Sequence, residues 1–138
     1  MKRDHVVKWN GDLTFVGSGA SGHSAVLDGD KEKGMSPMEM LLLSAGACAC
    51  IDLVMILKKA RQKVINVRVE LGGERRDEMP KYFTSIEMHF VVEGVAVRES
   101  HVRRGIELAM EKYCSASAQL AALAEITTSY EIIEKELN

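Results

Sequence analysis

Three cysteines, Cys48, Cys50 and Cys114, are the residues of this chain whose chemistry could extend beyond packing. A thiol becomes a nucleophile or a metal ligand when its thiolate is populated, which requires a nearby positive charge, hydrogen-bond donors or a helix N-terminus. Cys48 lies about three turns into a predicted helix, so the helix dipole contributes little to its ionisation. Asp52, one turn later on the same face, opposes ionisation. Activation of Cys48 therefore requires a residue that the fold brings close.

Each cysteine also has a structural interpretation, because most free cysteines behave as small buried hydrophobic residues. Cys48 and Cys50 are two helical positions apart and face different directions, so at most one of them is expected to share a site with Cys114. One CxC pair, one distant cysteine and four scattered histidines match no structural zinc pattern. The sequence therefore predicts no bound metal.

A long helix is expected to carry Cys48. It has a clear start at residues 36–39, where Ser36 can act as N-cap and Pro37 suits the first helical position. Glu39 can complete a capping box by accepting a hydrogen bond from the Ser36 amide. The helix is predicted to span residues 37–62, with basic residues in its last turns that complement the dipole.

The rest of the chain predicts a single α+β domain over residues 1–138. Alternating apolar residues and turn signals indicate strands at residues 5–9, 13–16, 23–27, 65–71, 84–92 and 126–133. Helical spacing indicates two further helices at residues 98–114 and 115–123. The expected order is βββ-α-ββ-α-α-β, with the fourth and fifth strands antiparallel. A GxGxxG pattern at residues 17–22 is followed by a strand-like segment instead of a helix, so a flexible loop is favoured over a nucleotide site.

Composition limits the expected partners and compartment. The net charge is −2, from 18 basic and 20 acidic residues, and gives no electrostatic reason to expect nucleic acid or an anionic membrane. Residues 40–57 are nearly all apolar and about as long as a membrane span, but small residues and Asp52 in their middle favour a crowded protein core. An odd number of cysteines and the lack of a signal-peptide pattern at residues 1–9 predict a cytoplasmic protein.

The segments around Cys48 and Cys114 resemble the two cysteine motifs of the OsmC/Ohr family. SPMEMLLLSAGAC, which ends at Cys48, and the following IDLV and ILKK resemble the first-cysteine helix, and EKYCS around Cys114 resembles the second motif. Residues 73–76 and the strand ending at Gly94 also fall in family order, so the resemblance covers almost the whole chain. It implies an OsmC-like fold with a long central helix, in an intertwined homodimer whose active sites lie at the subunit interface.

Resemblance to the peroxidase-type members implies thiol-dependent reduction of hydroperoxides, organic ones preferred. Cys48 would attack the hydroperoxide, and its sulfenic acid would condense with Cys114 to a disulfide. An external dithiol such as a lipoyl group would reduce that disulfide, and no cofactor is implied. Cys50 has no counterpart role and is expected in the core.

The sequence departs from the peroxidase-type pattern at two places. Those members have a glutamate directly after the helix-start proline, where this chain has Met38, and Glu39 follows one position later. Glu39 is therefore either a catalytic candidate or only the capping residue. Peroxidase-type members also carry an arginine in the N-terminal β region, where His23 is the basic residue here between positions 8 and 31. Arg75 and Arg76 are conceivable substitutes, although a solvated polar turn also explains them.

These residues are compatible with three different functions. A peroxidase requires a reactive thiolate at Cys48 and Cys114 within disulfide reach. A non-catalytic module would hold a small apolar molecule in a cleft that the cysteines merely line. A redox sensor would form the Cys48–Cys114 disulfide without efficient turnover.

Overall fold

The structure is a computed structural model that describes residues 1–136. Its contacts group into two compact units, Met1–Leu42 and Leu43–Asn138. The predicted α+β order βββ-α-ββ-α-α-β is confirmed, with one π-helical turn, η1, added between the last two helices. A single domain over residues 1–138 stays a prediction.

The first unit contains a three-stranded antiparallel sheet. Its strands are β1 (Val6–Trp9), β2 (Thr14–Ser18) and β3 (Ser24–Asp28), in the order β1-β2-β3. The turn between β1 and β2 places Gly11 at a φ of 92°, which glycine adopts without strain. The glycine-rich segment at 17–22 connects β2 to β3 as a second hairpin. No helix follows it, so the loop interpretation of the GxGxxG pattern is correct.

The helix α1 (Pro37–Lys59) begins with the predicted capping box. The Glu39 amide donates to Ser36 Oγ at 3.2 Å, and the Ser36 amide donates to Glu39 Oε2 at 3.3 Å. The helix ends at Lys59, earlier than the predicted residue 62. Arg61 has a φ of 60°, and the Gln62 amide donates to the Leu57 carbonyl, which is the hydrogen bond of a Schellman motif. This left-handed residue is not glycine, which is why the sequence did not indicate the earlier end.

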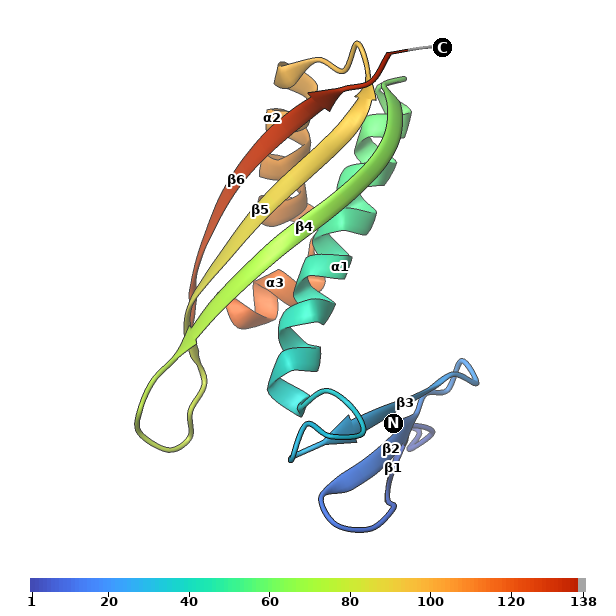
Figure 1. Ribbon diagram of the computed structural model, residues 1–138, viewed down its shortest axis with the longest axis vertical. Helices are drawn as coiled ribbons and strands as arrows, with labels where there is room; N and C mark the ends of the chain where they lie inside the picture. Colours follow the sequence, from blue (N-terminus) through green and yellow to red (C-terminus); the bar gives the residue numbers. More distant parts are fainter. Residues whose placement is uncertain (137–138) are drawn as a thin grey trace. The chain divides into compact units, whose positions relative to one another are not determined.

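The second unit is built on a long curved sheet with helices on one face (Figure 1). Its strands are β4 (Lys63–Arg75), β5 (Phe83–Val95) and β6 (Glu125–Glu134). β4 and β5 pair antiparallel, as predicted, and β5 and β6 pair parallel. A parallel neighbour requires a crossover connection, which α2 (Glu99–Leu108), η1 (Ala109–Tyr113) and α3 (Ser115–Leu120) provide. β4 and β5 extend beyond the predicted 65–71 and 84–92 because their pairing continues through Gly72 and Gly73.

Small residues let α1 approach the sheet closely. Ala45, Ala49 and Leu53 on its inner face are fully buried. A Cβ added to Gly46 would lie 2.6 Å from Leu71 Cδ1 of β4, so only glycine fits there without movement of that side chain. By length and composition α1 could cross a membrane. Its inner face instead packs into the core of an α+β domain, as the small residues predicted.

Replacing Ser36 with alanine should lower the free energy of unfolding by about 1 kcal/mol, because the first turn of α1 loses its N-cap acceptor. Glu39→Gln should cost less, since a glutamine oxygen can still accept from the Ser36 amide. Urea denaturation monitored by circular dichroism measures both changes. Unchanged stability of Ser36→Ala would contradict a working capping box.

Candidate active site

Cys48, Asp52 and Cys114 come together in the second unit. Their two Sγ atoms and a carboxylate oxygen of Asp52 all lie within 4.8 Å of one another. Cys48 and Asp52 are one turn apart on α1 and therefore share a face. Cys114 comes from the junction between η1 and α3, far along the chain. The fold thus brings together the two cysteines that the family resemblance paired, and it adds a carboxylate to them.

The side chain of Cys114 is held by the start of α3. Cys114 is the N-cap residue of that helix, and its Sγ accepts a hydrogen bond from the Ser117 amide at 3.4 Å. Its thiol also donates to Ser117 Oγ at 2.9 Å. The π-helical turn before it is closed by a 2.7 Å hydrogen bond from the Cys114 amide to the Ala109 carbonyl. These contacts fix the thiol at the end of a rigid turn, a backbone feature that is frequent at functional sites.

Burial raises the pKa of two cysteine thiols, those of Cys114 and Cys50. It raises the pKa of Cys114, which is only 2% exposed, and the neighbouring Cys48 raises this pKa further. The hydrogen bonds from Ser117 act in the opposite direction without reversing the shift. Burial also raises the pKa of Cys50, which is not part of the cluster. Cys114 is therefore a neutral thiol at neutral pH, a state that suits a resolving cysteine better than an attacking one.

Asp52 carries an unsatisfied oxygen at this site. Its Oδ2 atom is buried and has no hydrogen-bond partner among the described residues. Buried polar atoms are nearly always hydrogen-bonded, so an exception marks a place where a partner arrives later or a proton is exchanged. Within residues 1–136, no lysine or arginine forms an ion pair with this carboxylate. The cluster thus consists of two thiols and one acid.

A small hollow adjoins the cluster. It has a volume of about 240 Å³ and is lined by Asp52, Met55, Ile56, Lys59 and Tyr113. Asp52 belongs to both the hollow and the cluster, and Tyr113 directly precedes Cys114. Methionine, isoleucine and the tyrosine ring make most of this lining apolar, so the hollow suits a small organic molecule better than a strongly hydrated one.

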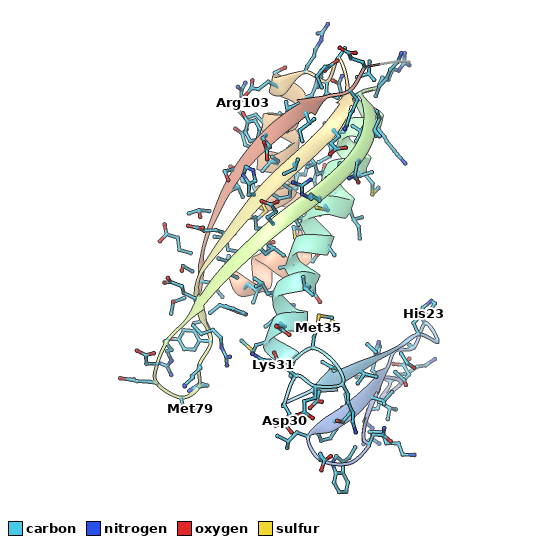
Figure 2. The ribbon with its side chains drawn as sticks, in the orientation of Figure 1. His23, Asp30, Lys31, Met35, Met79 and Arg103 are labelled. Atoms are coloured by element: carbon cyan, nitrogen blue, oxygen red, sulfur yellow. The ribbon has the colours of Figure 1, made fainter. Side chains whose placement is uncertain are left out.

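Glu39 and the two candidate arginines have other partners. Glu39 accepts from the Ser36 amide and is not in the cluster of Cys48, Asp52 and Cys114. Arg75 Nε donates to the Lys81 carbonyl at 2.6 Å, and Arg76 Nε donates to the Pro80 carbonyl at 2.7 Å. Both arginines therefore brace the loop between β4 and β5, at whose tip Met79 lies (Figure 2). Within this chain their contacts are those of a polar turn.

Sequence reasoning missed two contributors to this site. Ser117 was not singled out, although it stands three residues after Cys114, the spacing by which an N-cap side chain meets the N3 amide. Tyr113 falls within the helix predicted at residues 98–114, but it is 48% exposed and lines the hollow. It is the last residue of the π-helical turn, which leaves no signal in the apolar spacing.

Thiolates and carboxylates are also ligands of zinc. A structural zinc site uses four such ligands, and the cluster supplies three from the described part of the chain. The arrangement does not complete a structural zinc site, and the absence of a bound metal stays a prediction.

Comparisons with known proteins agree on the family. The family model described as OsmC-like protein matches residues 29–129. Protein YhfA of Escherichia coli strain K12 is 47% identical over 128 residues, which cover 92% of this chain and 96% of YhfA. A hypothetical protein from Aquifex aeolicus VF5 is 32% identical, with a TM-score of 0.88 over 99% of each chain. An organic hydroperoxide resistance protein OsmC from Legionella pneumophila has a TM-score of 0.69 at 13% identity, over 92% of this chain and 96% of that one, which shows a shared fold.

The raised pKa of Cys114 predicts a loss of stability at alkaline pH. Its ordinary value is 9.0, so the unfolded chain loses this proton at a lower pH than the folded chain. The contribution is fully present below pH 9.0 and is lost as the pH rises from there through the folded pKa. Urea unfolding at about pH 7.5 and about pH 10 should show a smaller loss for Cys114→Ser than for wild type. Equal losses in the two proteins would contradict the assignment.

Proposed function

Since the chain belongs to the OsmC-like protein family, we propose that it reduces organic hydroperoxides with the thiols of Cys48 and Cys114. The observation that carries the proposal is the proximity of the two Sγ atoms, which lie within 4.8 Å of each other. A disulfide requires about 2.05 Å between sulfurs, a distance that side-chain rotation can close. Two free cysteines from distant segments are therefore poised to form a bond.

The proposed reaction has three balanced steps. The Cys48 thiolate attacks the distal oxygen of ROOH, becomes a sulfenic acid and releases RO⁻, which leaves as ROH after protonation. The Cys114 sulfur then attacks the Cys48 sulfur, so a disulfide forms and the hydroxyl group leaves as water. An external dithiol reduces this disulfide by two exchange reactions and becomes a disulfide itself. Two electrons thus pass from the dithiol to the peroxide in each cycle.

Exposure distinguishes the roles of the two thiols. Cys48 is half-buried, whereas Cys114 is 2% exposed and hydrogen-bonded to Ser117. A hydroperoxide from solution therefore meets Cys48 first. The apolar hollow beside Asp52 favours an organic substituent on the peroxide. Glu39 stays a weaker catalytic candidate, because its carboxylate accepts from the Ser36 amide.

The outer face of α1 supports a homodimer. Leu43, Ile51 and Met55 recur at helical spacing on one stripe and are 45%, 61% and 64% exposed. Large apolar side chains that gather on one helix face mark an interaction surface. We propose that a second copy of the chain covers this stripe. An approaching subunit could also supply a cation beside Cys48.

The peroxidase proposal predicts rapid consumption of cumene hydroperoxide by the wild type with dihydrolipoamide as reductant. Cys48→Ser should abolish this turnover, because the attacking sulfur is lost. Cys114→Ser should leave one stoichiometric reaction and block turnover through the intramolecular disulfide. Cys50→Ser is the matched control and should retain turnover, since Cys50 lies outside the cluster. A coupled assay of dihydrolipoamide oxidation measures the rates.

Measurements on the same proteins distinguish the peroxidase from the redox sensor and the binding module. Wild-type turnover no faster than that of free thiol would refute the peroxidase. A stoichiometric Cys48–Cys114 disulfide that dithiols reduce slowly would indicate a redox sensor. Unchanged binding of a small apolar molecule by Cys48→Ser and Cys114→Ser proteins, with no oxidation chemistry, would indicate a binding module.

The dimer proposal is tested by Ile51→Glu, which places a charge in the apolar stripe. We expect analytical ultracentrifugation to give a dimer for the wild type and a monomer for Ile51→Glu. Leu123→Glu is the control, because Leu123 is similarly exposed, at 63%, but lies outside α1. A monomeric wild type would refute the dimer.

A further inference from the structure

We propose that Asp52 is the general acid–base residue of the step that closes the Cys48–Cys114 disulfide. This inference rests on the proposed peroxidase function and assigns a role that the cysteine pair alone does not supply. Asp52 would accept the thiol proton of Cys114 and deliver it to the hydroxyl group that leaves Cys48.

The position of Asp52 suits both halves of this transfer. One of its carboxylate oxygens lies within 4.8 Å of the Sγ atoms of both Cys48 and Cys114. The one-turn spacing on α1 holds Asp52 and Cys48 on the same face, whatever the state of the sulfur. The same carboxyl group is therefore near both the proton donor and the proton acceptor of the step.

The unsatisfied oxygen allows Asp52 to accept a proton. Asp52 Oδ2 is buried and has no hydrogen-bond partner among residues 1–136. A carboxylate whose oxygens were fully occupied by donors would be a poor proton acceptor. Here one buried oxygen is available to accept a proton.

The resolving step needs such a base because Cys114 reacts from a buried, protonated state. Its thiol donates to Ser117 Oγ at 2.9 Å, and a hydroxyl group is not basic enough to keep the proton. The sulfenic acid on Cys48 needs a proton in the same step, since hydroxide is a poor leaving group. The balance is Cys48–S–OH + H–S–Cys114 → Cys48–S–S–Cys114 + H2O, with Asp52 returned to its starting state. A carboxylate within 4.8 Å of both sulfurs connects the proton source to the proton acceptor.

The test separates peroxide attack from disulfide closure in single-turnover experiments. Reduced protein is mixed with one equivalent of cumene hydroperoxide without reductant, and dimedone traps the sulfenic acid at successive times for mass spectrometry. Asp52→Asn keeps the size of the side chain and removes the base. Peroxide should still be consumed, while disulfide formation slows about 100-fold, within the range of general acid–base catalysis, and the dimedone adduct accumulates.

Two controls distinguish proton transfer from structural support. Asp77→Asn makes the same charge change in the exposed loop between β4 and β5 and should close the disulfide at the wild-type rate. In a Cys114→Ser background, which cannot close the disulfide, adding Asp52→Asn should not increase dimedone trapping further. An additional increase there would mean that Asp52 changes the formation or lifetime of the sulfenic acid independently of disulfide closure, and it would overturn the proposal.

Different results would refute the peroxidase function and the role of Asp52. If the wild type consumes hydroperoxide no faster than free thiol, the peroxidase function fails. If the wild type reacts and Asp52→Asn closes the disulfide equally fast, the peroxidase stands and the role of Asp52 is refuted. Should Asp52→Asn fail to fold, the wild type alone decides, because proton transfer by Asp52 requires slower disulfide closure in D2O. Equal closure rates in H2O and D2O would overturn the proposal.

Discussion

The close approach of α1 to its neighbours is the constraint on which the site depends. Gly46 lets the helix meet Leu71 of β4, and Gly105 of α2 leaves room for Leu53 of α1 on another side. A larger residue at either glycine would clash with a methyl group of the facing leucine, so that side chain would have to move. Because Cys48 is on α1 and Cys114 follows α2 and η1, the same contacts set the distance between the two sulfurs. The packing of small residues therefore determines how close the two thiols lie.

The electrostatics of this site follow from what α1 and α3 contribute. Two thiols and the Asp52 carboxylate lie together, and the described residues place no ion-paired cation with that carboxylate. Burial disfavours the thiolate of Cys114, so the cluster holds a protonated thiol close to a carboxyl group. A thiol such as Cys114 then reacts by passing its proton to a base as the sulfur–sulfur bond forms. In the proposed mechanism this differs from activation by a guanidinium, and it makes the absence of an arginine between Lys8 and Lys31 less damaging to the resolving step than to the attacking step.

Local sequence signals predicted the elements well where they act within a few residues. The box at Ser36 and Glu39 fixed the start of α1, and alternation located β4 and β5. The end of α1 was placed too late, because the left-handed turn occurs at Arg61 instead of a glycine. For the site, the resemblance paired Cys48 with Cys114, but Ser117 and Tyr113 were missed. Their roles depend on the π-helical turn and on tertiary contacts, which no spacing in the sequence encodes.

The apolar composition of α1 is explained by its two faces, the inner face in the core and the exposed outer face. A helix on the surface of a monomer is usually polar on its outer face. In α1, Ala49 and Leu53 fill the core while Ile51 and Met55 on the other side stay exposed, so both faces are apolar. That is why the segment has the hydropathy of a membrane span. If a second subunit covers the outer face, as proposed, the apolar composition reflects two protein interfaces on one helix, with the reactive thiol of Cys48 between them. Mutations along α1 should then affect association and thiol chemistry together, except where they touch only one face.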